Sequence, residues 1–443
     1  MNIRDRRRSV LAVAVVATAG LVLFGLPRHD RTLSADEPKP LAVSGRADKR
    51  LASFDRLMTG FLKKHDLPGA SLAVTRNGRL VAARGYGLAD RETGRPVEPD
   101  SLFRIASISK PITAVAILQL VERERLSLDD RVLDVLKLKP GTDAARLKRV
   151  TIRQLLQHTA GWDRGVSFDP MFQPVLIARV LGRRPPAGAN DVIRFMMRWP
   201  LDFDPGTRYA YSNFGYCLLG RVIEKRTGRS YESAVRRSVL EPLGIRDMRI
   251  GRTRSSRRRK QEVAYHVGGE RVGLSVFAED LGERVSRADG AWHLEAMDSH
   301  GGWIASAIDL VRFAAAFDDP ENCPLLKAGS IAVMFARPPA PVGLDKDGQP
   351  EEVYYGLGWR IRRAGESGRS NQWHMGALPG TSTLLVRRHD HTNWAVLFNT
   401  RQACDGRSPA SAIDPLVHQA ADGVKEWPDE DRFGEFLKTV RDD

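Results

Sequence analysis

Cysteine is scarce in this chain of 443 residues, which has only Cys217, Cys323 and Cys404. Three cysteines are too few for a disulfide framework, and their odd number leaves at least one unpaired. Cys217 lies in an apolar stretch, which predicts a buried thiol. Cys323 and Cys404 occur in loop-like sequence. One bridge between them stays open for an oxidising compartment, although we favour free thiols.

Motifs typical of metal or nucleotide sites are absent from the sequence. It has no His-Glu-x-x-His, no paired Cys-x-x-Cys, no phosphate-binding glycine loop and no Gly-x-Ser-x-Gly elbow. The spacing of His389-Asp-His391 could suit a metal, but this tripeptide lies between two apolar runs and predicts a hairpin turn. We therefore expect no metal, nucleotide or other cofactor, and the alpha/beta-hydrolase fold lacks support.

Aromatic residues are not interleaved with the strongest basic run, Arg252 to Lys260. The net charge of +15 invites a nucleic-acid hypothesis. A basic run without aromatics offers no stacking platform for bases, so we expect no nucleic-acid partner. We interpret the run as a solvated loop. Weak contact with anionic lipid or an anionic wall polymer is the alternative.

The start of the chain has the layout of a secretory signal, with four arginines before the apolar residues 10–26. The apolar stretch is long for a cleaved signal and just long enough to span a bilayer. We therefore predict export to a periplasmic or other extracytoplasmic compartment. Cleavage near Ala35 and retention as a membrane anchor both stay open. The expected parts are the signal or anchor 1–26, a flexible linker 27–47, one folded domain 48–425 and a tail 426–443.

One short segment combines a serine and a lysine in a way that suggests chemistry. Ser107 and Lys110 are three residues apart where a helix begins, and therefore share one helical face. Serine needs a neighbouring base to become a nucleophile, and a lysine amine can serve. The simpler alternative is a chance pair in which Ser107 only caps the helix. The apolar residues 114–121 favour a buried helix with a rigid first turn.

Strand signals occur at both ends of the folded part, with helical periodicity between them. A helix from residue 48 precedes a hairpin around Asn77-Gly78, with strands at 70–75 and 80–83. Further strands are predicted at 354–362, 381–387 and 393–399, and a closing helix at 409–421. The irregular segment 166–200 is a candidate lid or substrate wall. This pattern predicts an α+β fold, with an antiparallel sheet flanked by helices and a mainly helical second lobe. We expect the active site at the junction of the sheet and this lobe.

Two later motifs complete a known order. Tyr211-Ser-Asn213 is the only Tyr-x-Asn in the chain, and His374-Met-Gly376 precedes a predicted strand. Ser-x-x-Lys, Tyr-x-Asn and basic-x-Gly in this order resemble the serine beta-lactamase and penicillin-binding protein superfamily, in particular its class C beta-lactamase, DD-peptidase and esterase branch. Other stretches look like the same family, so the likeness covers about residues 50 to 420: 87–94, 155–161, 301–310 and 355–359.

The resemblance implies a role for each motif residue. Ser107 would be the nucleophile that forms an acyl-enzyme, and Lys110 and Tyr211 would transfer protons. We expect the Lys110 cation to stabilise a Tyr211 anion. Asn213 would hydrogen-bond Lys110 and a substrate amide. The oxyanion hole would consist of the backbone N–H groups of Ser107 and Ala377. With Asn213, two further residues would line the substrate site, namely His374 and Gly376.

The third motif departs from the Lys-Thr-Gly of most beta-lactamases. Met375 cannot donate a hydrogen bond, and we expect His374 to be only partly charged at neutral pH. Efficient beta-lactam hydrolysis is thus put in doubt. His374 could instead steer the Tyr211 proton or serve only the structure. We interpret His158 as a structural residue at a helix C-terminus, where positive charge is favourable.

Three hypotheses follow. The first is an exported serine hydrolase that acts on an ester, a small amide or a D-amino-acid peptide, with esterase or peptidase activity ranked above beta-lactamase activity. The second is a non-catalytic binding protein of the same fold, which recognises the cell wall or a partner protein. The third is a tethered surface protein whose basic run, Arg252 to Lys260, binds an anionic polymer.

Overall fold

The computed structural model describes residues 40–267, 272–364 and 369–436. The predicted signal or anchor, residues 1–26, lies outside these ranges, as does most of the predicted linker. None of the described helices is both long enough and apolar enough to cross a membrane.

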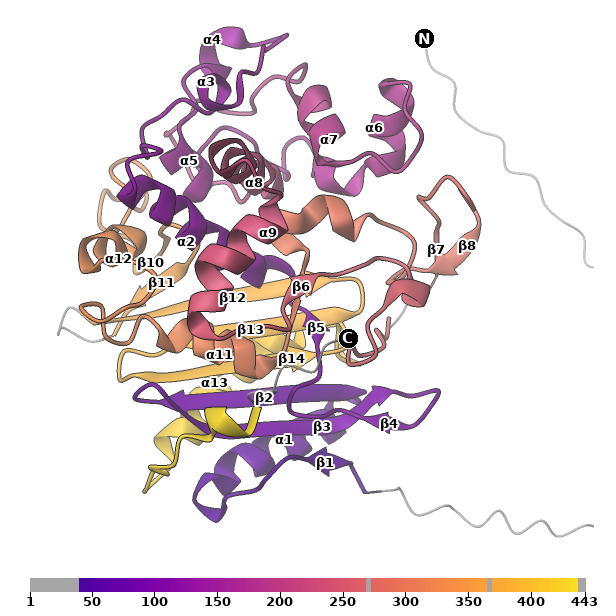
Figure 1. Ribbon diagram of the computed structural model, residues 1–443, viewed down its shortest axis with the longest axis vertical. Helices are drawn as coiled ribbons and strands as arrows, with labels where there is room; N and C mark the ends of the chain where they lie inside the picture. The colour runs from indigo at the N-terminus through magenta and orange to yellow at the C-terminus, as the bar shows by residue number, and fades with distance from the viewer. Residues whose placement is uncertain (1–39, 268–271, 365–368, 437–443) are drawn as a thin grey trace, which may run out of the picture. The chain divides into compact units, whose positions relative to one another are not determined.

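An antiparallel sheet joins the two ends of the folded chain (Figure 1). The predicted hairpin is present, and Asn77 and Gly78 form its turn with φ of 49° and 77°. The later strand β14 pairs with β2 and thereby closes the sheet. The strand order is β1 (Val43–Ser44), β3 (Arg79–Asp90), β2 (Gly69–Arg76), β14 (Thr392–Phe398), β13 (Thr381–Arg387), β12 (Ser370–Leu378), β11 (Arg360–Arg363) and β10 (Val353–Tyr355), with β4 (Arg95–Pro96) beside β3.

Both faces of this sheet are covered, so its central strands are buried on both sides. In β14, Trp394 and Val396 belong to one apolar cluster, whereas Ala395 and Leu397 belong to the other. This alternation follows from the two-residue period of a strand. The first cluster lies under α1 (Ala52–Lys64) and α13 (Pro409–Asp422), and the second under α11 (Ala307–Ala315).

The middle of the chain forms the mainly helical lobe, as predicted (Figure 1). Its helices are α2 (Ser109–Glu122), α3 (Val132–Leu136), α4 (Ala144–Leu147), α5 (Ile152–Leu156), α6 (Pro174–Val180), α7 (Ala189–Met196), α8 (Asn213–Thr227), α9 (Tyr231–Val235), α10 (Asp298–Gly301) and α12 (Ala328–Phe335). Shorter turns are η1 (Lys49–Leu51), η2 (Ala106–Ile108), η3 (Pro170–Phe172), η4 (Arg236–Leu240), η5 (Glu241–Leu243), η6 (Ser255–Arg257), η7 (Leu294–Met297) and η8 (Arg432–Phe436). Small sheets combine β5 (Phe103–Arg104), β9 (Trp303–Ala305) and β6 (Arg249–Ile250), and β7 (Val272–Leu274) with β8 (Arg284–Ser286).

Several local predictions need correction. The strand predicted at 354–362 is divided into β10 and β11 by a turn that includes Gly358, whose φ is 87°. The segment 166–200 is helical rather than irregular, because it contains η3, α6 and α7. All three cysteines are free, so the alternative of a bridge between Cys323 and Cys404 is wrong.

The basic run is only partly a solvated loop. Arg254 Nη1 lies 2.6 Å from an Asp280 carboxylate oxygen, and Arg258 Nη2 lies 2.9 Å from Asp289. Thr253, directly before Arg254, is fully buried. Two arginines of the run therefore hold the fold together, whereas Arg257, Arg259 and Lys260 are exposed.

Residues at both expected domain limits contact the sheet. β1, within the predicted linker, pairs with β3. Near the other end, Asp431 accepts a hydrogen bond from the backbone N–H of Leu80 at 3.1 Å, and the side chain of Arg432 is buried.

Candidate active site

The nucleophile candidate lies in a tight turn between β5 and α2. Ser107 is the only residue between positions 101 and 120 that is not buried. Ala106 before it has φ of 50°, a left-handed conformation that costs a non-glycine residue about 1 kcal/mol. The Ser109 hydroxyl donates to the Ala106 carbonyl at 2.7 Å and so holds the turn. The fold thus presents one hydroxyl from an otherwise buried segment.

Lys110 is fully buried, and its amine contacts three oxygen atoms. Nζ lies 3.1 Å from Ser107 Oγ, 2.8 Å from Asn213 Oδ1 and 3.0 Å from the His300 carbonyl oxygen. Burial lowers the pKa of Lys110 well below its usual range. A neutral amine here can donate to Asn213 and His300 and accept the Ser107 proton with its lone pair. Lys110 thus has the geometry of a general base.

Tyr211 lies beside this pair in a different charge state from the one predicted. Lys110 Nζ lies 4.7 Å from the centre of the Tyr211 ring. Burial raises the pKa of Tyr211, and a hydrogen bond with Ser107 lowers it only in part. The expectation that a Lys110 cation stabilises a Tyr211 anion is therefore wrong for the resting site. The phenol keeps its proton and is suited to donate it.

Asn213 connects Lys110 to a carboxylate that the motifs do not indicate. Its Nδ2 donates to Asp169 Oδ2 at 2.6 Å, while its Oδ1 accepts from Lys110. Arg164 Nη1 lies 3.8 Å from the same Asp169 oxygen. Asp169 caps η3 by accepting from the Met171 N–H at 3.2 Å. The segment predicted to be a lid or wall therefore contributes a side chain that fixes the Asn213 amide.

His158 supports the Tyr-x-Asn segment from behind and is neutral. Its Nδ1 accepts the Ser212 backbone N–H at 3.1 Å, and its ring centre lies 4.3 Å from that of Tyr211. Burial lowers the pKa of His158 well below its usual value. The structural interpretation of His158 agrees with these contacts. Its expected positive charge is wrong.

His374 is buried and neutral rather than partly charged. Its Nδ1 donates to the Met375 carbonyl at 2.7 Å, so Nε2 accepts from the Tyr355 hydroxyl at 2.9 Å. Burial lowers the pKa of His374 to about 3. The Met375 side chain packs in the apolar cluster under α1 and α13, and its sulfur lies 3.5 Å from Ser411 Oγ of α13. Met375 is thus directed away from the Ser107 side of the sheet.

The backbone of β12 runs directly past the nucleophile turn. A Cβ atom on Gly376 would lie only 2.2 Å from the Ile105 carbonyl oxygen and 3.0 Å from the Ala106 Cβ. β12 pairs with β13 along its length, but with β11 only as far as Trp373. Ala377 is exposed on the remaining segment. Among the described strands, none covers the β11-side edge here, so the Ala377 backbone is accessible as a possible oxyanion donor.

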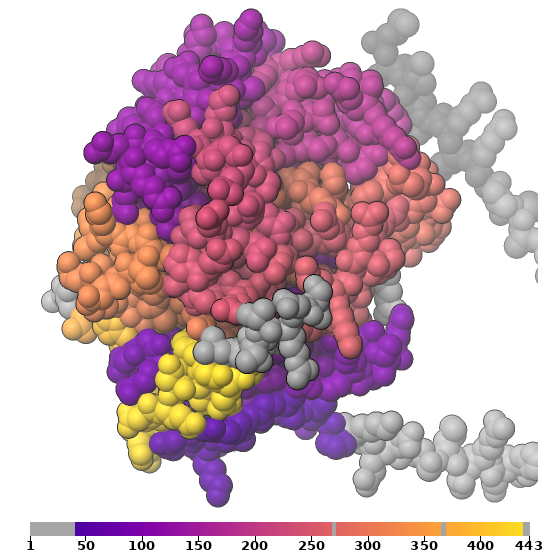
Figure 2. Space-filling view, viewed as in Figure 1, coloured from indigo at the N-terminus to yellow at the C-terminus, as the bar shows by residue number. Residues whose placement is uncertain are grey.

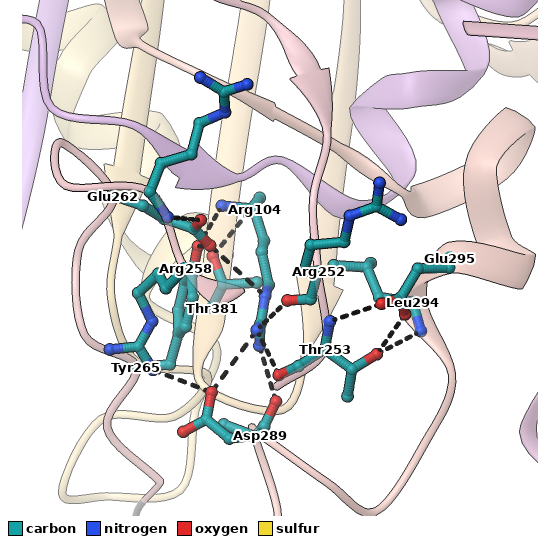
Figure 3. A network of polar contacts seen from close by, with 12 residues as sticks. Arg104, Arg252, Thr253, Arg258, Glu262, Tyr265, Asp289, Leu294, Glu295 and Thr381 are labelled. Carbon is teal, nitrogen blue, oxygen red and sulfur yellow. Dashed lines mark hydrogen bonds and ion pairs between the residues drawn. The ribbon is translucent and has the colours of Figure 1, made fainter. Parts of the chain in front are cut away.

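A buried cation anchors the strand that leads to Ser107. The Arg104 side chain is fully buried, and its guanidinium donates to the carbonyl oxygens of Ala288, Arg252 and Thr253 at 2.7, 2.9 and 3.0 Å (Figure 3). Glu262 and Asp289 carboxylates lie 3.8 and 3.5 Å from it. The network joins three distant segments to β5 at Arg104, which lies three residues before the nucleophile candidate Ser107.

Comparison with known proteins identifies the family and the fold of this chain. A sequence profile described as Beta-lactamase matches residues 54–414, which is most of the chain. The chain belongs to the beta-lactamase family. Its α+β fold agrees with that of the octameric penicillin-binding protein homologue from Pyrococcus abyssi, at a TM-score of 0.62 and 26% identity over 86% of this chain and 79% of that one.

Two curated relatives of this chain are named for different classes of protein, an esterase and a penicillin-binding protein. Esterase EstB of Burkholderia gladioli is 35% identical over 48% of this chain and 55% of its own length. Penicillin-binding protein 4 of Amycolatopsis lactamdurans is 32% identical over 63% of this chain and 67% of its own. This beta-lactamase family chain therefore spans about half to two thirds of the length of these two relatives.

Two arginines that the motifs do not include, Arg164 and Arg360, lie beside aromatic residues of the site. Arg164 lies with its guanidinium carbon 4.9 Å from the Tyr211 ring centre. Burial, and then the charges of Arg287 and Arg164, lower the pKa of Arg401. A pocket opens beside Tyr209 and Tyr355, with Arg360 in its wall. All four arginines are exposed: Arg164, Arg287, Arg360 and Arg401.

Proposed function

We propose that this protein is an exported serine hydrolase that acts on an ester, an amide or a D-amino-acid peptide through an acyl-enzyme at Ser107. One observation carries the proposal: the amine of the buried Lys110 lies 3.1 Å from Ser107 Oγ, the one hydroxyl of its segment that is not buried. The names of the relatives, which include an esterase and a penicillin-binding protein, support this class.

The reaction has two stages. The Ser107 proton moves to the Lys110 amine as Oγ attacks the substrate carbonyl carbon, and the backbone N–H groups of Ser107 and Ala377 stabilise the oxyanion. Tyr211 protonates the leaving oxygen or nitrogen, the bond to it breaks, and the Lys110 proton restores Tyr211. Water then attacks the acyl group, again with Lys110 as base, and Ser107 leaves with a proton.

We rank ester and peptide hydrolysis above beta-lactam hydrolysis. The reason is His374 rather than Met375, because the Met375 side chain packs on the far face of the sheet. His374 occupies the place of the Lys-Thr-Gly lysine, yet burial lowers its pKa to about 3. A neutral imidazole provides no charge for the substrate carboxylate at that place.

A covalent trap tests the nucleophile. A fluorophosphonate is expected to add its mass to the peptide that contains Ser107, and Ser107→Ala is expected to lose the adduct. Ser256→Ala is the matched control, since Ser256 is exposed in η6. A folded wild-type protein without an adduct would overturn the Ser107 assignment. Reversible penicillin binding without an adduct would support the non-catalytic cell-wall binding alternative.

A substrate panel tests the reaction class. It compares short-chain nitrophenyl esters, a D-Ala-D-Ala peptide and a chromogenic cephalosporin. We expect higher kcat/KM for the ester or the peptide than for the cephalosporin.

A matched pair of substrates, nitrophenyl butyrate and nitrophenyl hydrogen succinate, tests the role of the arginines near the site. Their positive charge is expected to favour the negatively charged succinate ester. A preference for the neutral ester would contradict this role of Arg164 and its neighbours.

Export rests on the sequence of residues 1–26 alone. Cells that express the full chain are expected to carry it outside the cytoplasm, whereas a chain that starts at residue 40 stays inside. Fractionation with protease protection distinguishes the two locations. If the full chain and the shortened chain were found in the same compartment, export through this segment would be contradicted.

A further inference from the structure

Two adjoining clefts lie on the helical lobe, away from the candidate active site. The first lies along α9, η4 and η5, and the second is bounded by the ends of α2 and α8. α9 faces the viewer in Figure 1, and this part of the chain lies at the centre of the face shown in Figure 2. Arg229 and Arg237 line both clefts. The two clefts therefore form one groove, which we call the arginine groove.

The charges in the arginine groove are strongly unbalanced. Five arginines line it against two glutamates, Glu232 and Glu241: these arginines are Arg123, Arg125, Arg229, Arg236 and Arg237. Glu232 already accepts a hydrogen bond from the Ile250 backbone N–H at 3.0 Å. One wall is apolar, with Ala116, Leu120 and Ile223.

The groove arginines have no carboxylate partners among the described residues. None of these residues places an acidic oxygen within ion-pair distance of Arg229, Arg236 or Arg237, and Arg236 Nε is buried without a hydrogen-bond partner. Burial, and then the charges of Arg236 and Arg259, lower the pKa of the adjacent Arg249. The positive field thus continues from the groove towards the exposed end of the basic run.

We propose that the arginine groove binds a linear polyanion that carries phosphate groups. Guanidinium groups bind phosphate oxygens with two parallel hydrogen bonds, and a row of them matches a row of phosphates. This proposal is separate from the anionic contact expected at Arg252 to Lys260, which stays a prediction. Within that run, Arg254 and Arg258 are engaged by Asp280 and Asp289.

The concave shape favours a polymer over a membrane surface. Four of the groove arginines are exposed, whereas Arg236 is partly buried and therefore less accessible to a flat bilayer. A single chain can enter a cleft and contact arginines on both sides. The shared arginines Arg229 and Arg237 would then contact consecutive phosphates of the same chain.

Fluorescence anisotropy with dye-labelled inorganic polyphosphate tests the proposal with the full folded domain. Arg229→Gln/Arg237→Gln is expected to weaken binding about tenfold at low salt. It is also expected to reduce the slope of log K against log salt by about 1.4, since each phosphate contact on a single strand contributes about 0.7. Lys63→Gln/Lys64→Gln on α1 removes the same charge from a distant exposed surface and is expected to leave the affinity within about twofold.

Two further measurements keep the test decisive. Arg123→Gln/Arg125→Gln repeats the test from the other cleft, and ester hydrolysis confirms that every variant is folded. Vesicles of phosphatidylglycerol and phosphatidylcholine measure the membrane alternative. Equal loss in the groove and α1 variants, or no loss in either groove variant, overturns the proposal. Binding to vesicles but not to polyphosphate also overturns it.

Discussion

At the residue scale, the buried Lys110 determines how pH acts on the site. Because burial lowers its pKa, the amine is the form that accepts the Ser107 proton, and acidification converts it to an ammonium that cannot. We expect kcat/KM for a neutral ester to fall as the pH decreases through this lowered pKa. Lys110→Arg replaces the base with a permanent cation and is expected to cost about 10²- to 10⁴-fold in acylation rate.

Stopped-flow acylation measured against pH checks this prediction. Lys260→Arg serves as the control, since Lys260 is exposed in the basic run. An unchanged rate in Lys110→Arg would mean that the amine is not the base.

Tyr211→Phe tests the second proton transfer, because its ring still packs but cannot protonate the leaving group. It is expected to slow a poor leaving group more than nitrophenol.

His374 provides a second prediction, on stability. Its pKa is about 3 in the folded protein and about 6.5 in an unfolded chain, so the unfolded state binds more protons between these values. The free energy of unfolding therefore falls as the pH decreases below about 6.5. Between pH 7.5 and 5.5 this site contributes a loss of about 1 kcal/mol. In urea denaturation, the loss between pH 7.5 and 5.5 is expected to be about 1 kcal/mol smaller in His374→Gln than in the wild type, because the buried His158 and His300, whose pKa values are also lowered, still contribute in both proteins.

At the element scale, the contact between β12 and η2 determines whether the oxyanion donors meet the nucleophile. Gly376→Ala would place its Cβ 2.2 Å from the Ile105 carbonyl oxygen and 2.3 Å from Thr383 Oγ1. The strand and turn must then separate, at a cost of about 1–3 kcal/mol. We expect about a 100-fold loss in kcat, because the donors no longer match the oxyanion.

Gly60→Ala is the matched control for this prediction. Gly60 lies inside α1, and an added Cβ would meet no atom within 4 Å. This control is expected to stabilise the helix by about 0.5–1 kcal/mol and to leave kcat unchanged. Equal activity in the two alanine variants would show that the approach of β12 does not set the donor geometry.

Elements with strong local signals could be predicted from the sequence. β13 spans the predicted residues 381–387, and the Asn77-Gly78 turn and the closing helix also agree. The split between β10 and β11 was missed because Gly358 lies against α2, where an added Cβ would approach the Ala114 Cβ to 2.7 Å. Periodicity records local alternation and contains no information on a distant helix.

At the scale of the whole molecule, the motif residues were predictable but their supports were not. Ser107, Lys110 and Asn213 meet as their order suggested. Asp169 and Arg104 belong to no motif, because their partners lie far along the chain. The pKa values also depend on burial, so the lowered pKa values of Lys110 and His374 emerged only from the folded structure.

Arg104 offers the most direct test of how distant segments of the chain hold β5 in place. Its guanidinium connects β5 with residues 252–253 and 288–289, and the Tyr265 ring centre lies 4.0 Å from it (Figure 3). Arg104→Met leaves the Glu262 carboxylate buried beside an apolar side chain, and breaking such a pair costs about 3–5 kcal/mol. We expect a lower Tm and slower acylation, because the strand before Ser107 loses its anchor.

Arg104→Met/Glu262→Gln removes both charges and is expected to recover part of the Tm. Arg56→Met, an exposed change on α1, is expected to alter neither quantity. No recovery in the double variant would mean that the carbonyl contacts, rather than the ion pair, hold the nucleophile strand.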